Sequence, residues 1–261
     1  LDAPWPPLVV SCGRKAALIA MGMRHDMEKR GETTTRFIHI QDPRAPAECY
    51  DLVVAMRHDG ITGPNVISVR FSLHAVTPSA LNGARGQFAP RFVSCPKPHV
   101  AVLLGGSTNK YTLTKKAMAR VIEVLETLLK NTPGSLLITP SRRTGAENIR
   151  MLAAHFSGNP RAYIYDGTGD NPYMGLLALA DHIVVTDDSV NMMGEAHATG
   201  KPLYVLPLPG HRHTKPARFA AELIKDGIAR PLGKALESWT YPASDEMAML
   251  AAEIRKRLTL P

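Results

Sequence analysis

The sequence predicts an α/β fold built from two Rossmann-like domains, in which parallel sheets carry helices on both faces. Short apolar runs alternate with helical patterns along nearly all of the 261 residues. Most runs are continuously apolar, which is typical of parallel strands buried on both faces. Several of them end in turns rich in Gly, Ser, Thr or Asp. In open parallel sheets, ligands bind at that edge.

The expected strands fall into two groups. The first group comprises Leu8–Ser11, Phe37–Ile40, Leu52–Ala55 and Val66–Val69, and the second comprises Val100–Leu104, Leu136–Ile138, Ala162–Tyr165, Ile183–Thr186 and Leu203–Leu206. Between the groups, residues 73–98 are rich in Pro, Gly and polar residues, which is typical of a linker. We therefore expect an N-terminal domain over residues 1–98 and a C-terminal domain over residues 99–242.

The clearest helix is expected from about Thr114 to Lys130, where apolar residues share one stripe. A second amphipathic segment, Asp245–Leu258, lies within the remaining residues 243–261. We expect this segment to pack back across the domains. Because the first group of strands starts abruptly, the N-terminal domain is expected to lack its opening β-α unit.

Composition limits the class of partner. The formal net charge is +8, which favours an anionic partner. The basic residues are dispersed and have no interleaved aromatic residues, so we expect no nucleic acid and favour a phosphorylated small molecule or an anionic membrane surface. No apolar run reaches the ~18 residues of a membrane span, and we see no signal peptide. Three cysteines without CxxC spacing indicate reduced thiols. We expect a cytoplasmic protein, with peripheral attachment to the inner membrane face left open.

The most informative stretch follows the expected strand Ile183–Thr186. There, a polar turn of Asp187, Asp188 and Ser189 leads into a short helix that carries Glu195. Free N–H groups converge at a helix N-terminus and suit a phosphate or pyrophosphate. Glu195 lies one to two turns further, where its carboxylate can meet a sugar hydroxyl. No metal is expected, because the two aspartates have no further His or carboxylate at ligand spacing. The stretch predicts a nucleotide-sugar site.

Two neighbouring turns could contribute to the same site. Gly105 and Gly106 allow a tight turn and a close approach of the backbone to a ligand, and Ser107 adds a hydroxyl donor. A bare strand-to-loop turn is the alternative. Arg142 and Arg143 follow the next strand, where paired guanidiniums are well placed to clamp a diphosphate. The alternative is that both arginines lie on the surface in contact with solvent and bind no ligand.

In the N-terminal domain, the segments IQDPR and MRHDG follow two expected strands. Asp42 and His58 in these segments are candidate catalytic residues, because a carboxylate and an imidazole can exchange protons across a cleft. Ordinary loop residues are the alternative for both.

Several segments, in order along the chain, carry a resemblance to a known family: LVVSCGRKAA, IHIQDPR, DLVVAMRHD, VAVLLGGST, LLITPSRRT, YDGTGDNPYMGLLALAD and VVTDDSVNMMGEAHATGKPLYVLPL. The chain resembles the bacterial proteins related to the plant mitochondrial fission factor called "elongated mitochondria". Members of that family usually begin with a further strand and a Gly-containing loop, which this sequence lacks.

The C-terminal half is also similar to the donor domain of GT-B glycosyltransferases, especially the enzyme that adds N-acetylglucosamine to the peptidoglycan lipid precursor. Ser189, Glu195 and residues 200–202 fall on its pattern of a serine turn, a ribose-binding glutamate and a Gly-x-Pro strand start. Residues 105–107 match its Gly-Gly-Ser. The resemblance implies a GT-B-like fold and a nucleotide-diphosphate sugar as substrate, without a cofactor or a metal.

The resulting hypothesis is a glycosyltransferase that moves a sugar from the nucleotide donor to a cell-envelope acceptor. Glu195 would hold the ribose hydroxyls, while Arg142 and Arg143 would neutralise the leaving diphosphate. Asp42 or His58 would deprotonate the acceptor. Two alternatives stay open. One is a catalytically silent scaffold that recruits partners at a membrane surface, as the plant relatives do, and the other is a nucleotide-sugar 2-epimerase.

Overall fold

The computed structural model describes residues 5–109, 111–209, 214–242 and 246–258. The chain divides into two compact units, of which the first contains residues 1–73 and 245–261 and the second contains residues 74–244. The division differs from the predicted boundary at residues 98 and 99, because residues 74–98 pack with the second unit. Residues 243–245 and 259–261 of the predicted C-terminal segment lie outside the described residues.

The first unit holds a parallel sheet of four strands in chain order: β1 (Leu8–Cys12), β2 (Arg36–Ile40), β3 (Leu52–Met56) and β4 (Val66–Val69). The connecting segments include α1 (Arg14–Lys29) and the short 3-10 helices η1 (Ala47–Cys49) and η2 (Arg57–Asp59). Over residues 5–73 this sheet is continuous, and it gives no support to the expectation that an opening β-α unit is missing.

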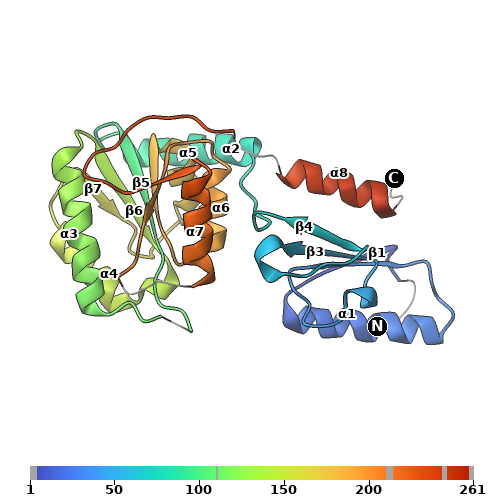
Figure 1. Cartoon of the computed structure of the whole chain (residues 1–261). Helices are drawn as coiled ribbons and strands as arrows, with labels where there is room; N and C mark the ends of the chain where they lie inside the picture. Colours follow the sequence, from blue (N-terminus) through green and yellow to red (C-terminus); the bar gives the residue numbers. More distant parts are fainter. Residues whose placement is uncertain (1–4, 110, 210–213, 243–245, 259–261) are drawn as a thin grey trace. The chain divides into compact units, whose positions relative to one another are not determined.

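Successive strand residues point to opposite faces of this sheet. Phe37 and Val53 pack with Ala17 and Ala20 of α1 on one face. On the other face, Ile38 packs in a cluster with Leu250, which belongs to α8 (Glu246–Leu258) (Figure 1). The predicted C-terminal helix therefore forms, and it completes the first unit.

A carboxylate fixes the start of α8. Both oxygens of Glu246 accept backbone hydrogen bonds, from the N–H groups of Arg70 and Phe71, each at 2.7 Å. Charge-assisted bonds of this kind are about twice as strong as neutral ones. The helix is thus attached to the segment that follows β4 by polar bonds as well as by its apolar face.

The second unit holds a parallel sheet of six strands in the order β10-β9-β8-β5-β6-β7. The bounds are β5 (His99–Leu104), β6 (Ser135–Pro140), β7 (Ala162–Ile164), β8 (His182–Thr186), β9 (Leu203–Leu206) and β10 (Ala229–Pro231). Strands β6 and β7 lie on one side of β5, and the later strands β8, β9 and β10 lie on its other side. The strand order reverses between β5 and β8, and a doubly wound sheet binds its ligands at such a switch point.

Helices cover both faces of this sheet, which confirms the predicted α/β class (Figure 1). They are α2 (Pro78–Phe88), η3 (Ala89–Phe92), α3 (Lys115–Asn131), η4 (Arg142–Thr144), α4 (Ala146–His155), α5 (Tyr173–Leu179), α6 (Val190–His197) and α7 (Lys215–Lys225). Val100, Val102 and Leu104 of β5 pack with Leu125 of α3. All residues of β5 are buried, as expected for a central strand covered on both sides.

Two elements of the second unit differ from the sequence prediction. Helix α2 forms inside the expected linker, because Thr77 caps its N-terminus and Pro78 starts it. Arg85 of this helix donates a hydrogen bond to the carbonyl of Ala178, which anchors α2 against α5. Strand β10 was not predicted, since three residues that end in Pro231 give no periodic signal. No helix in the described parts of the chain has the length and apolar character needed to cross a membrane.

Candidate functional site

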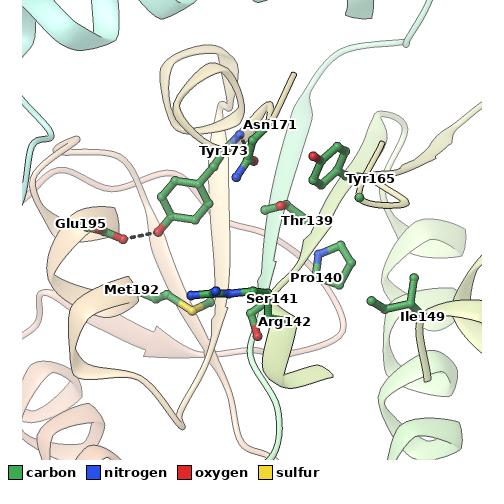
Figure 2. A pocket seen from close by; sticks show the side chains of 11 residues that line it. Thr139, Pro140, Ser141, Arg142, Ile149, Tyr165, Asn171, Tyr173, Met192 and Glu195 are labelled. Atoms are coloured by element: carbon green, nitrogen blue, oxygen red, sulfur yellow. Dashed lines mark hydrogen bonds between the residues drawn. The ribbon is translucent and has the colours of Figure 1, made fainter. Parts of the chain in front are cut away.

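A pocket of about 630 Å³ lies at the carboxyl ends of β6 and β7 in the second unit. Its wall includes Arg142, Ile149, Tyr165, Tyr173, Met192 and Glu195 (Figure 2). The volume falls within the range of small-molecule sites, which is about 300–1,000 Å³. Two charged side chains of opposite sign and two tyrosines give this pocket polar groups that can orient a ligand.

Helix α6 places Glu195 in the pocket wall. The Ser189 hydroxyl caps this helix by accepting a hydrogen bond from the Met192 N–H at 3.4 Å. Met192 and Glu195 lie about one turn apart on the same face and both line the pocket. Met193 and Ala196, on the adjacent face of the helix, are fully buried. The apolar face of α6 thus fixes which of its residues reach the pocket.

The Tyr173 hydroxyl donates a hydrogen bond to Oε2 of Glu195 (Figure 2). Tyr173 is the first residue of α5, and its N–H donates to the Asn171 side chain at 3.0 Å. Burial raises the pKa of Tyr173 far above its ordinary value, and the nearby negative charge of Glu195 raises it further. The hydroxyl therefore keeps its proton and acts toward Glu195 as a donor.

The sequence predictions assign no role to Tyr173, which lies in the segment YDGTGDNPYMGLLALAD. A pairing of Tyr173 with Glu195 depends on how α5 packs beside α6, so no local pattern could have revealed it.

Arg142 lies in the turn that follows β6 and lines the pocket (Figure 2). The Ser141 hydroxyl begins that turn by accepting a hydrogen bond from the Arg143 N–H at 3.2 Å. The neighbouring Arg143 has a different role, because its guanidinium forms an ion pair with Asp188 at 2.8 Å. The two predicted arginines thus diverge, and only Arg142 is among the pocket-lining residues.

Asp188 joins three strand ends through its fully buried carboxylate. It accepts hydrogen bonds from the Thr186 hydroxyl at 2.6 Å and from the Gly106 N–H at 3.0 Å. Arg143 neutralises the charge. We call Asp188, Arg143, Thr186 and Gly106 the Asp188 network. The network holds the turns after β8, β5 and β6 in fixed positions beside the pocket.

The two glycines serve this network. A Cβ atom on Gly105 would overlap the Asp188 carboxylate, and one on Gly106 would overlap the Arg143 carbonyl. The Gly105 N–H donates to the Thr186 hydroxyl at 2.8 Å. The structure shows a close approach of this backbone to neighbouring turns, and its approach to a ligand stays a prediction.

Ser107 and Asp187 also have partners within the fold. The Ser107 hydroxyl accepts a hydrogen bond from the Leu113 N–H at 2.9 Å, and Asp187 accepts one from the Leu208 N–H at 2.9 Å. Among the predicted nucleotide-binding residues, the structure therefore brings Arg142 and Glu195 together at the pocket. The remaining ones stabilise the turns behind it, and a direct role for them in binding a diphosphate stays a prediction.

Asp42 and His58 lie in the first unit, after β2 and within η2. Asp42 accepts a hydrogen bond from the Arg44 N–H and pairs with the Arg44 side chain, both at 2.8 Å. His58 lies 3.7 Å from a carboxylate oxygen of Asp59. Their catalytic roles stay predictions. Over the described part of the chain, no cluster of three or more His, Cys, Asp or Glu residues could hold a metal ion.

Comparison with known sequences gives a family match over most of the chain. The family model described as "Mitochondrial fission ELM1" matches residues 1–258. The mitochondrial fission protein ELM1 of Arabidopsis thaliana is 32% identical over 283 residues, which cover 97% of this chain and 64% of that protein. An uncharacterized protein of Rickettsia prowazekii is 25% identical over 299 residues and is covered to 82% of its length.

Solved structures show a shared fold. The UDP-GlcNAc 2-epimerase of Methanocaldococcus jannaschii, solved with UDP-GlcNAc and UDP, aligns with a TM-score of 0.57 at 14% identity. The alignment covers 98% of this chain and 76% of that one. The UDP-GlcNAc 2-epimerase of Neisseria meningitidis, bound to UDP-GlcNAc, aligns with a TM-score of 0.55 at 14% identity. That alignment covers 97% of this chain and 70% of the epimerase chain. The likeness confirms the predicted GT-B-like architecture and shows the fold alone.

Proposed function

This chain belongs to the mitochondrial fission ELM1 family, and we propose that its second unit binds a nucleoside diphosphate sugar in the pocket that Glu195 and Arg142 line. The observation that carries this proposal is the placement of a carboxylate and a guanidinium in one pocket beside the N-terminal half of α6. A carboxylate accepts hydrogen bonds from sugar hydroxyls, and a guanidinium binds phosphate oxygens.

Each group has a distinct part in the proposed complex. Glu195 accepts hydrogen bonds from the ribose, and Arg142 binds the diphosphate together with N–H groups of the first turn of α6. The base lies toward Tyr165 and Ile149, which supply the less polar side of the pocket. Fold neighbours solved with UDP-GlcNAc support this class of ligand.

The binding proposal has a direct test by calorimetry with uridine, guanosine and cytidine diphosphates. At least one of them is expected to bind, and Glu195→Ala is expected to weaken that binding by about tenfold or more, since it removes a charged acceptor. Glu147→Ala is the matched control, because Glu147 is an exposed acid that pairs with Lys115 at the surface. Absence of binding by all three diphosphates, or equal loss in both variants, would contradict the proposal.

The finer proposal is glycosyl transfer to a cell-envelope acceptor. The bond between the sugar and the diphosphate breaks as the acceptor oxygen bonds to the same sugar carbon. The acceptor proton then passes to a base, for which Asp42 and His58 are the candidates. Arg142 and the α6 N-terminus would stabilise the negative charge that develops on the leaving diphosphate. Release of uridine diphosphate from UDP-GlcNAc only when an envelope lipid extract is added would support transfer. A sugar epimerised without any acceptor would instead indicate a 2-epimerase.

Membership of this family favours a second candidate, a scaffold that recruits partners at a membrane surface without catalysis. The net charge of +8 suits an anionic bilayer. The test is co-sedimentation with vesicles of phosphatidylglycerol and phosphatidylcholine. Vesicle binding that persists in Glu195→Ala, in a protein that binds no nucleotide, would favour the scaffold. Under this candidate we expect the protein at the cytoplasmic face of the inner membrane.

A further inference from the structure

The hydrogen bond between Tyr173 and Glu195 joins two helices at the wall of the pocket (Figure 2). Tyr173 starts α5, and Glu195 lies near the end of α6. Both side chains line the pocket. A glutamate on a helix surface ordinarily samples several rotamers, and the bond from the Tyr173 hydroxyl restricts that freedom for Glu195.

The bond engages one carboxylate oxygen and leaves the other available. Oε2 of Glu195 accepts from the Tyr173 hydroxyl, while Oε1 has no protein donor among the described residues. A carboxylate oxygen has room for about two hydrogen bonds. Held in this way, the group presents Oε1, and the remaining lone pair of Oε2, to two neighbouring hydroxyls of a ligand.

The rest of the wall limits how the carboxylate could turn if it were released. Arg142 is a cationic residue in the same pocket, and Met192 precedes Glu195 by about one turn on the same face of α6. A carboxylate released from the hydroxyl would be attracted by the guanidinium or by water. In either arrangement it is less well aligned with a vicinal pair of hydroxyls.

We propose that Tyr173 is a positioning residue, which orients Glu195 to accept hydrogen bonds from both the 2′- and 3′-hydroxyls, so that the pocket selects ribonucleotides over 2′-deoxyribonucleotides. The inference rests on the proposed nucleotide site and adds to it a residue that acts through Glu195. Selectivity of this kind is expected because a site built to bind a hydroxyl leaves a polar group unpaired when that hydroxyl is absent.

The test compares uridine diphosphate with 2′-deoxyuridine diphosphate by calorimetry, or the matching pair of guanosine or cytidine diphosphates if that base binds more tightly. The wild-type protein is expected to prefer the ribose form by about tenfold, as one charge-assisted hydrogen bond warrants. Tyr173→Phe keeps the ring but removes the donor. It is expected to bring the preference close to one, because it weakens binding of the ribose form more than binding of the deoxyribose form, which offers Glu195 only its 3′-hydroxyl.

Tyr204→Phe is the matched control. The hydroxyl of Tyr204 donates to the carbonyl of Glu237 in the same unit at 2.8 Å, and Tyr204 is not one of the residues that line the pocket. This variant is expected to retain the preference for ribose. In the Glu195→Ala background, Tyr173→Phe is expected to have no further effect, because the group that it orients is absent.

The readout is a ratio of two affinities measured on one preparation, so a fraction of misfolded protein affects both and leaves the ratio unchanged. A ribose preference that survives in Tyr173→Phe overturns the inference and leaves the proposed function standing. A wild-type protein that binds the two forms equally also overturns the inference and leaves the proposed function standing. A wild-type protein that binds no nucleotide overturns both.

Discussion

Replacing Asp188 by Asn tests whether the Asp188 network stabilises the second unit. The substitution keeps the side-chain volume and one oxygen, which can still accept from the Thr186 hydroxyl. It removes the charge that faces Arg143. Because the Thr186 hydroxyl bonds to Oδ1, the NH₂ group takes the place of Oδ2 and faces both the Gly106 N–H and the guanidinium, where two donors cannot bond. A buried donor without an acceptor costs about 1–3 kcal/mol, and a hydrogen bond to a charged group contributes about 1.5–3 kcal/mol.

The exposure of Arg143 limits the expected loss of stability. Removing one member of a fully buried ion pair costs about 3–5 kcal/mol. The Arg143 side chain is 38% exposed, whereas the Asp188 side chain is fully buried, so water can hydrate the guanidinium that loses its partner. We therefore expect Asp188→Asn to lower the free energy of unfolding of the second unit by about 2–4 kcal/mol.

The two tryptophans of the chain give each unit its own fluorescence signal. Trp5 packs with the α1 side of the first sheet, and Trp239 lies against Tyr204 in the second unit, with ring centroids 5.0 Å apart. In the Trp5→Phe background, urea unfolding reports on the second unit. The Trp239→Phe background reports on the first, where Asp188→Asn is expected to change stability by less than about 0.5 kcal/mol. A loss below about 1 kcal/mol in the Trp239 transition would refute the reasoning.

Two further predictions follow from packing and burial. Gly106→Ala is expected to destabilise the second unit by about 1–3 kcal/mol, because the added methyl overlaps the Arg143 backbone. An added methyl on Gly83 in α2 meets open space, so Gly83→Ala is expected to stabilise the second unit by about 0.5–1 kcal/mol in the same urea assay. Burial lowers the pKa of Lys201 from 10.5 to about 8, so between about pH 8 and 10.5 the unfolded chain holds a proton that the folded protein has released. In that window the contribution of Lys201 to stability rises with pH, and Lys201→Met is expected to remove the rise; an identical pH dependence in both proteins would contradict a lowered pKa.

The strands could be predicted because most are continuous apolar runs that are followed by Gly, Pro or a polar residue. Val66–Val69 and Leu203–Leu206 form with the predicted bounds. The remaining predicted strands extend or shorten by one or two residues at their ends, where hydrogen bonding to the neighbouring strand decides the boundary. Helix α2 was not predicted, since Gly83 and Gly86 lower its helix propensity and resemble a linker, and its packing against α5 is a tertiary contact.

At the candidate site, local sequence was sufficient for Glu195 but not for its surroundings. A strand, a polar turn and a helix place Glu195 at the sheet edge whatever the rest of the fold does. The separate roles of Arg142 and Arg143 depend on which of them faces Asp188, which is a tertiary contact across two crossover connections. The same holds for the glycines, whose neighbours are other turns of the protein.

The return of α8 to the first unit has a consequence for how the protein is made. During synthesis the first sheet leaves the ribosome long before Glu246 and Leu250, and until then the face that carries Ile38 has no α8 to cover it. The nascent chain must therefore carry an uncovered apolar surface while the whole second unit is translated. A chaperone that binds apolar surface would be needed most in this interval, and a premature stop codon just before α8 would leave that surface permanently uncovered.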